Sequence, residues 1–229
     1  MTVSDKKLYR GEIQKRWTFF VGGLILLALG IALTIKGKDL GISPWDVFHY
    51  GLSLHFGLTV GLWSILAGLT IVLVTSLFTR SVPRIGTFLN MILVGLFIDF
   101  FNWLLPDVEL FWIEVLVFIL GIFISAYGVG IYVAPNLGAG PRDSVMLLIN
   151  KATGWKVSRV RNGIELLVCV AGFFLGGPVG IGTILIVLCM GHIIGYAIPQ
   201  SEQLLNYVIR RGDRDEDLNQ GTLRLNHHD

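Results

Sequence analysis

The sequence is short of charged residues. Only 15% of its 229 residues are Asp, Glu, Lys or Arg, whereas a soluble domain carries roughly 25%. The deficit is concentrated in long apolar runs, and the mean hydropathy is +0.69. A soluble globular protein is therefore excluded, and the composition predicts an integral membrane protein in contact with lipid. The net charge of +2 is too small to argue for nucleic acid as a partner.

Cysteine is nearly absent as well. Cys169 and Cys189 both lie inside apolar runs, so they predict neither a disulfide framework nor a metal site. The sequence also lacks a phosphate-binding glycine loop, a nucleophile elbow, and any His, Cys and carboxylate cluster with ligand spacing. We therefore expect a protein that is not an enzyme, with no cofactor and no metal. The first apolar run lacks an A-x-A-type cleavage site, so we interpret it as a retained span.

One short motif occurs twice. The stretch Leu40-Gly-Ile-Ser-Pro-Trp-Asp46 has a second copy, Leu137-Gly-Ala-Gly-Pro-Arg-Asp143, whose numbers are higher by 97 (137 minus 40). Pro44 and Pro141 suit the first turn of a helix, and Ser43 with Asp46 fits a capping box. Each motif thus predicts a helix that starts just after another has ended. In a membrane, such breaks at repeated positions are typical of transporter sites.

The apolar runs predict six transmembrane helices, because each is close to the ~20 residues needed to cross hydrocarbon. They cover approximately residues 17–35, 58–78, 85–105, 111–134, 157–175 and 181–198. A short helix follows each motif, to about residue 56 in the first half and about residue 152 in the second. The sequence leaves open whether these two short helices are re-entrant.

The repeat extends beyond the motif. Gly23 and Gly30 match Gly121 and Gly128, and the tripeptide that begins at Ile85 matches a second copy 96 residues on (181 minus 85). Each half has three spans, an odd number, so the halves must insert with opposite topology. The predicted fold is therefore an all-α membrane bundle made of two inverted three-helix repeats.

The predicted organisation has five parts. They are an N-terminal segment (1–16), a first repeat (17–105), an acidic link (106–110), a second repeat (111–199) and a tail (200–229) that we expect to be partly disordered from Arg210. Most cations fall in the parts that share a side with the N-terminus. The positive-inside rule therefore predicts that both termini are cytoplasmic.

The two motifs supply the predicted binding residues. These are Ser43, Pro44, Trp45, Asp46, Pro141, Arg142 and Asp143. Each acid is either only a helix cap, since a carboxylate suits the positive end of a helix, or a group that lines a central cavity. Carbonyls near the two breaks would add further ligands in the second case. Arg142 is expected to pair with Asp143, to hold an anionic group, or to act only as a topology charge.

Three ionisable residues inside the spans are candidates for coupling transport to protons. Glu165 must face protein or water, or be protonated, because a charge in lipid is costly; the alternative is a structural pair with Arg161 or Asn162. Asp99 lies among aromatic residues in the third span. A lone His192 is either a helix–helix hydrogen bonder or a proton relay.

The motif pair, its spacing and the six-span layout resemble the YczE/YyaS/YitT family of bacterial membrane proteins. The similarity covers roughly residues 12–200 and is strongest to the YczE branch, through the decapeptide 40–49 and the heptapeptide 138–144. The soluble C-terminal domain of YitT-type members has no visible counterpart, so that branch fits less well. The resemblance implies a multi-pass protein of the bacterial inner membrane and implies no particular chemistry.

Two functions fit these features. The first is a small secondary transporter or permease for a small cationic or zwitterionic solute, bound between the halves. The second is a non-transporting membrane scaffold or assembly factor for a partner enzyme, in which the acids are structural caps. The sequence leaves open the identity of the solute and whether the protein forms a homodimer.

Overall fold

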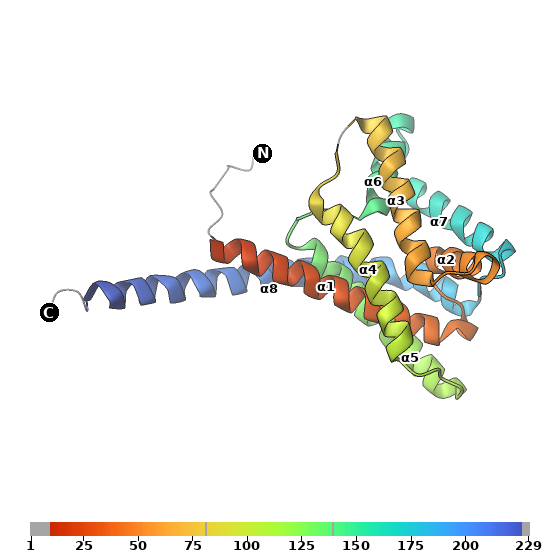
Figure 1. The fold of residues 1–229 in the computed structure, drawn as a ribbon, viewed down its shortest axis with the longest axis horizontal. Coiled ribbons are helices and arrows are strands. Elements are labelled where there is room, and N and C mark those ends of the chain that lie inside the picture. The colour runs from red at the N-terminus through yellow and green to blue at the C-terminus, as the bar shows by residue number, and fades with distance from the viewer. Residues whose placement is uncertain (1–9, 81, 139, 226–229) are drawn as a thin grey trace.

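The computed structural model describes residues 10–80, 82–138 and 140–225, with side chains except at 10, 143, 144, 147, 157, 158 and 212–225. Within these residues the secondary structure is entirely helical, as predicted (Figure 1). The elements are α1 (Arg10–Lys36), η1 (Lys38–Leu40), α2 (Pro44–Phe56), α3 (Val60–Thr79), α4 (Ile85–Leu104), α5 (Phe111–Val133), α6 (Pro141–Thr153), α7 (Val157–Phe174) and α8 (Ile181–Leu225).

Five helices of the described chain are long and apolar enough to cross a membrane: α1, α3, α4, α5 and α8. Their positions agree with five of the six predicted spans. The remaining one, α7, has the predicted bounds to within a residue, but Arg159, Arg161 and Glu165 fall in its first half. Length and apolarity therefore identify an integral membrane protein with five clear spans, and α7 needs a polar environment on one of its faces.

The helices begin and end where the motifs predict. Ser43 is the N-cap of α2, Pro44 occupies its first position, and the Ser43 side chain accepts a hydrogen bond from the backbone N–H of Asp46. Gly140 and Pro141 start α6 in the same way, without a side-chain cap. Gly41 lies at φ 95°, a conformation that favours glycine. The predicted breaks after α1 and after α5 are thus confirmed.

Glycines bring α1 and α5 into close contact. A Cβ atom added at Gly30 would lie 2.7 Å from the carbonyl oxygen of Gly121, and one added at Gly128 would lie 2.7 Å from the Cα of Leu27. The later residue of α1 (Gly30) contacts the earlier residue of α5 (Gly121), and the earlier residue of α1 (Leu27) contacts the later one (Gly128). The two helices therefore run antiparallel (Figure 1). Small residues at such positions let backbones approach and gain dispersion contacts in lipid.

Two helices extend further than the apolar runs predict. The first helix starts at Arg10, ahead of the span expected from residue 17, and α8 continues to Leu225. The tail that we expect to be partly disordered from Arg210 is helical in its described backbone, 210–225. A helix that has already formed in its apolar part propagates at low cost through residues such as Arg, Glu, Gln and Leu. The start of α1 and the end of α8 lie on the same side (Figure 1).

Candidate functional site

A cavity of about 490 Å³ lies inside the bundle. Residues from all eight described α-helices line it, and both motifs contribute: Ser43, Pro44, Trp45 and Asp46 from the first, and Gly140, Pro141 and Arg142 from the second. This volume is within the range of small-molecule sites. Six of the seven predicted binding residues therefore share one cavity. The side chain of the seventh, Asp143, lies outside the described part of the structure.

The two chain breaks are held in matching ways. A Cβ added at Gly41 would lie 2.6 Å from the Oγ1 of Thr183, and one added at Gly138 would lie 3.1 Å from the Oγ1 of Thr87. Each break thus packs against the first turn of the last long helix of the other half, α8 or α4. Gly41 and Gly138 are equivalent in the two motif copies, and Thr87 and Thr183 are equivalent in the two repeated tripeptides. Residues that match in the sequence thus make equivalent contacts in the structure.

The motif helices meet through Trp45 and Arg142. The guanidinium carbon of Arg142 lies 4.6 Å from the centroid of the Trp45 ring, which is the geometry of a cation–π interaction. These residues occupy the same place in the two motif copies. The charge of Arg142 also acts on Asp46 and His49, so the positive group lies near both.

The Asp46 carboxylate is bound through one oxygen. The N-cap Ser43 donates its hydroxyl to the Oδ2 of Asp46 at 2.5 Å. The other oxygen, Oδ1, is buried and has no hydrogen-bond partner within the described chain. The residue is only 2% exposed. The contact with Ser43 therefore accounts for half of this carboxylate and leaves the other oxygen to be satisfied.

His49 lies one turn after Asp46 and is 1% exposed. Its Nδ1 is 4.0 Å from the Oδ1 of Asp46, too far for a hydrogen bond. Neither ring nitrogen has a partner among the described residues, and the same holds for the Nε1 of Trp45 and the Nδ2 of Asn90. Buried polar atoms are normally paired. Four such residues on the wall of one cavity indicate a place for a polar guest.

Glu165 and Arg161 form an ion pair on the cavity wall, with 3.1 Å between the Nε of Arg161 and the Oε1 of Glu165. Both lie on α7 and both line the cavity. The cavity thus accommodates two of the three charged residues of α7, whereas Arg159 is exposed and does not line it. Leu166, Leu167 and Val170 are exposed and suited to lipid.

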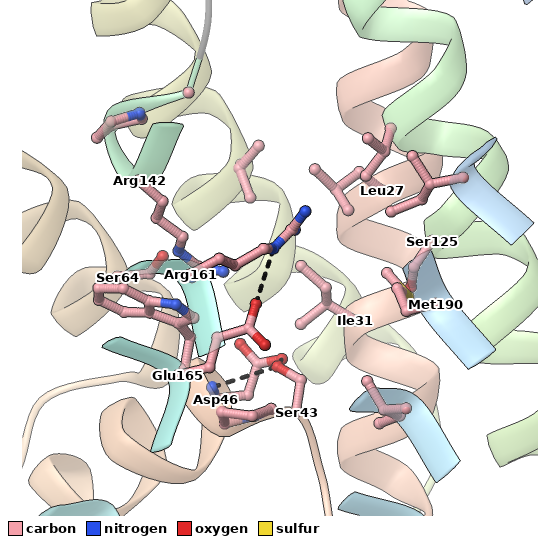
Figure 2. A pocket seen from close by; sticks show the side chains of 18 of the residues that line it. Leu27, Ile31, Ser43, Asp46, Ser64, Ser125, Arg142, Arg161, Glu165 and Met190 are labelled. Carbon is pink, nitrogen blue, oxygen red and sulfur yellow. Dashed lines mark hydrogen bonds and ion pairs between the residues drawn. The ribbon is translucent and has the colours of Figure 1, made fainter. Parts of the chain in front are cut away.

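The cavity has a polar and an apolar side. Ser43, Asp46, Arg142, Arg161 and Glu165 project from α2, α6 and α7, whereas Leu27, Ile31 and Met190 project from α1 and α8 (Figure 2). A guest in this cavity would meet charged groups on one side and aliphatic side chains on the other.

Asp99 and His192 are placed elsewhere. Asp99 accepts hydrogen bonds from the Thr59 hydroxyl and, at 2.9 Å, from the backbone N–H of Gly61, so it fastens the start of α3 to α4. His192 is exposed, with its Nδ1 2.9 Å from the carbonyl oxygen of Leu188. Neither residue lines the cavity, and only Glu165 of the three coupling candidates does.

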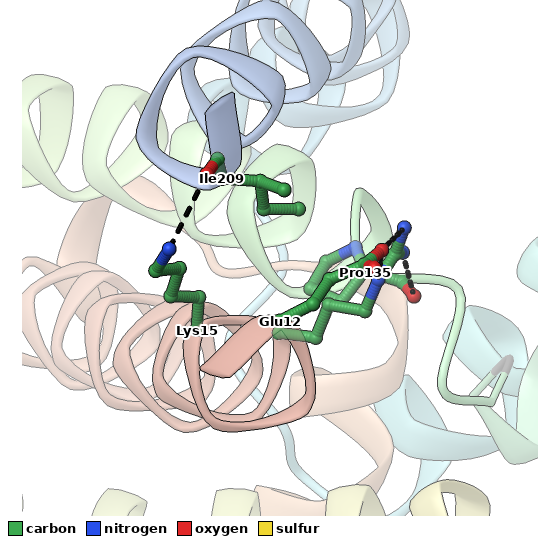
Figure 3. A network of polar contacts seen from close by, with 5 residues as sticks. Glu12, Lys15, Pro135 and Ile209 are labelled. Carbon is green, nitrogen blue, oxygen red and sulfur yellow. Dashed lines mark hydrogen bonds and ion pairs between the residues drawn. The ribbon is translucent and has the colours of Figure 1, made fainter. Parts of the chain in front are cut away.

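The backbone carbonyls after α5 already have partners. Arg16 donates from Nη1 to the carbonyl oxygen of Pro135 at 3.1 Å (Figure 3), and Arg84 donates to that of Asn136 at 3.1 Å. In the other half, Glu114 accepts from the backbone N–H of Asp39 at 3.0 Å. These contacts hold the breaks in place, and the carbonyls of Pro135 and Asn136 each accept one of them.

Ion pairs close the end of the bundle where α1 stops. Lys36 donates to Asp107 at 2.7 Å, and this hydrogen bond lowers the pKa of the Asp107 carboxyl. A hydrogen bond to Tyr50 at 3.0 Å raises the pKa of Lys38. The end of α1 and the α4–α5 connection thus lie together.

At the opposite end of the bundle, Arg84 and Asn136 join the α3–α4 connection to the end of α5.

Sequence reasoning missed His49, Asn90 and Arg161 as site residues. His49 was discoverable, since residues three apart lie on the same face of a helix and Asp46 was already a candidate. Asn90 lies in an apolar span with no motif around it. Its place on the cavity wall depends on how α4 is rotated, which no local pattern reveals.

The fold and the cavity define a polytopic, helical membrane protein with a cavity that carries polar and charged side chains on one side. A model of the family of unknown function DUF6198 matches residues 14–199, and the chain belongs to this family. No solved structure matches it.

The relatives confirm the YczE and YyaS parts of the resemblance. The uncharacterized membrane protein YczE of Bacillus subtilis (strain 168) is 56% identical over 200 residues, 87% of this chain and 93% of that protein. An uncharacterized protein of Haemophilus influenzae is 30% identical over 173 residues, 76% of this chain and 78% of that protein. The uncharacterized protein YyaS of B. subtilis is 29% identical over 202 residues, 86% of this chain and 99% of that protein.

Proposed function

We propose that this protein is a small secondary transporter of the bacterial inner membrane that moves a small cationic or zwitterionic solute. The observation that carries the proposal is the group of unpartnered polar atoms on Asp46, His49, Trp45 and Asn90 around one cavity. Polar atoms that are buried without partners cost free energy. A protein keeps them where a ligand completes the hydrogen bonds.

An inverted repeat supports this proposal. A Cβ added at Gly30 of α1 would lie 2.7 Å from the Gly121 carbonyl oxygen in α5, and one added at Gly128 of α5 would lie 3.0 Å from the Gly23 carbonyl oxygen in α1. In the sequence, Gly23 matches Gly121 and Gly30 matches Gly128. Matched residues thus exchange contacts, as a two-fold axis in the membrane plane would require. Trp45 and Arg142 meet near the same axis. Transporters with inverted repeats bind solute at such a place.

The two equivalent helix pairs differ, which supports alternating access. Between α2 and α7, a Cβ added at Gly172 would lie 2.6 Å from the Cα of Phe48. The matching pair, α6 and α3, has Thr75 in place of Gly172. We propose that the close α2–α7 contact is one gate of the transporter and that the α3–α6 contact is the other. Glu165 remains the candidate for coupling, and no catalytic step is part of the proposal.

Transport in liposomes tests this function. Purified protein should accumulate a solute from a broad library of radiolabelled amines and zwitterions under an imposed proton or sodium gradient. The variant Asp46→Asn should lose this uptake and still elute as a folded protein. The variant Asp107→Asn, which alters an exposed acid outside the cavity, is the control and should retain it. Absence of flux for every solute under both gradients contradicts the proposal.

A scaffold for a partner enzyme is the second candidate. It is favoured by α8, which continues to Leu225, well beyond its apolar part, and by the capping bond between Ser43 and Asp46. In this case Asp46→Asn and Asp143→Asn would change only stability, or nothing. Truncation after Arg211 separates the functions, because it should abolish partner recruitment by a scaffold and leave uptake by a transporter intact.

A further inference from the structure

The spacing of two unpartnered atoms limits what the cavity can hold. The Oδ1 of Asp46 and the Nδ1 of His49 are 4.0 Å apart. Two hydrogen bonds from one tetrahedral nitrogen would place their acceptors about 4.5 Å apart. A nitrogen that donates two hydrogens, such as a primary ammonium group, therefore has two nearby acceptors on α2. A quaternary ammonium has no N–H and makes neither hydrogen bond.

The other unpartnered atoms on the cavity wall are donors, including the Nε2 of His49 when its Nδ1 accepts a hydrogen bond. The indole Nε1 of Trp45 and the amide Nδ2 of Asn90 are both buried without partners in the described chain. Arg142 places a guanidinium over the face of Trp45. Donors and a positive charge call for an acceptor with negative charge, and a carboxylate meets both needs.

The charges of the cavity wall balance. Asp46 and Glu165 are acidic, and Arg142 and Arg161 are basic, and these are the acids and strong bases among the described lining residues. A guest with a net charge would leave an uncompensated charge in a poorly solvated space, which costs several kcal/mol. A guest with one positive and one negative group leaves the balance unchanged.

The opposite side of the cavity is mostly aliphatic, with Leu27, Ile31 and Met190 beside Ser125 (Figure 2). From these four features we infer that the solute is an α-amino acid, or a close analogue, with an apolar side chain. Its ammonium bridges Asp46 and His49, its carboxylate faces Trp45 and Arg142, and its side chain contacts α1 and α8. This inference rests on the proposed function and narrows it.

Four probes with one carbon skeleton test the inference on the full-length protein in nanodiscs. They are leucine, leucinamide, N-acetylleucine and N,N,N-trimethylleucine, which carry both charges, the cation only, the anion only, and both charges without N–H donors. Isothermal titration calorimetry should show leucine binding at least tenfold more tightly than each of the others. Equal affinity of leucinamide or of the trimethyl compound would overturn the inference, as would no binding of leucine at 10 mM.

Variants then assign the ammonium site. Asp46→Asn and His49→Gln should each weaken leucine binding at least tenfold. The matched controls Asp99→Asn and His192→Gln alter the same residue types outside the cavity and should leave the affinity unchanged within twofold. Retained affinity in both cavity variants would overturn the assignment.

The liposome screen keeps the two proposals distinguishable. Flux of a different solute class, without leucine binding, would refute the amino-acid inference and leave the transporter proposal standing. Leucine binding with no flux of leucine or any other solute would support the site and refute transport.

Discussion

The guanidinium of Arg142 lies over the ring of Trp45, with 4.6 Å between its central carbon and the ring centroid. The two residues come from equivalent positions of the two motif copies, so the repeat brings its own counterparts into contact. The contact also fixes the distance between the starts of α2 and α6, and hence the width of the cavity between them.

A double-mutant cycle should detect this contact. The variants Trp45→Leu and Arg142→Met each remove one partner, and the combined variant should be less destabilised than the sum of the two. The coupling expected of a partly buried cation–π pair is about 0.5–2 kcal/mol. Unfolding by denaturant in mixed micelles measures it. Strict additivity would show that the two side chains do not interact.

The variant Gly30→Ala should destabilise the bundle. Its new methyl group would lie 2.7 Å from the carbonyl oxygen of Gly121, inside the α1–α5 contact. Overpacking of this kind costs about 1–3 kcal/mol. Gly22→Ala is a matched control on the same helix, because a Cβ at Gly22 meets no atom within 4 Å. Equal stability of the two variants in mixed micelles would contradict the antiparallel α1–α5 packing.

The repeat predicts that Gly86→Ala and Gly182→Ala have similar effects. An added Cβ would lie 2.5 Å from the Leu137 carbonyl oxygen in the first case and 2.7 Å from the Leu40 carbonyl oxygen in the second. Each should displace one chain break and lower the thermal midpoint of the purified protein. Gly191→Ala meets no atom within 4 Å and should leave the midpoint unchanged. A large effect in only one half would argue against equivalent breaks.

Asp99→Ala should weaken the fold without affecting the cavity. The carboxylate satisfies the backbone N–H of Gly61 and the hydroxyl of Thr59 at the start of α3, and loss of a helix cap costs about 1–2 kcal/mol. The expected result is lower stability in denaturant with unchanged solute affinity. A loss of solute affinity with unchanged stability would instead indicate that Asp99 takes part in solute binding.

Sequence patterns located the helices because their causes are local. Apolar runs set the spans, and Ser43 with Pro44 set the start of α2. Sequence patterns also predicted seven binding residues, of which six line the cavity. They could do so because an inverted repeat implies that the two chain breaks lie close together. They did not identify Asp99 as a cap, because its partner Gly61 is 38 residues away. Nor did they show that Arg16 and Arg84 donate hydrogen bonds to the backbone carbonyls after α5, because these contacts join distant segments of the chain.

The arrangement of charge along the bundle makes the orientation testable. The Lys36–Asp107 pair places the α4–α5 connection at the end of α1, and the Arg84–Asn136 contact places the α3–α4 connection near its start. Arg16, which donates to the carbonyl oxygen of Pro135 after α5, and Arg84 are therefore at one end, which the positive-inside rule assigns to the cytoplasm.

Cysteine labelling measures this orientation in a background in which Cys169 and Cys189 are replaced by alanine. Glu109→Cys, in the α4–α5 connection, should react with a membrane-impermeant maleimide on intact cells. Val82→Cys, which replaces an exposed residue of the α3–α4 connection, should react only after the cells are permeabilised. Because the two positions lie at opposite ends of the bundle, the reverse pattern would invert the whole molecule and place the α2–α7 contact on the cytoplasmic side.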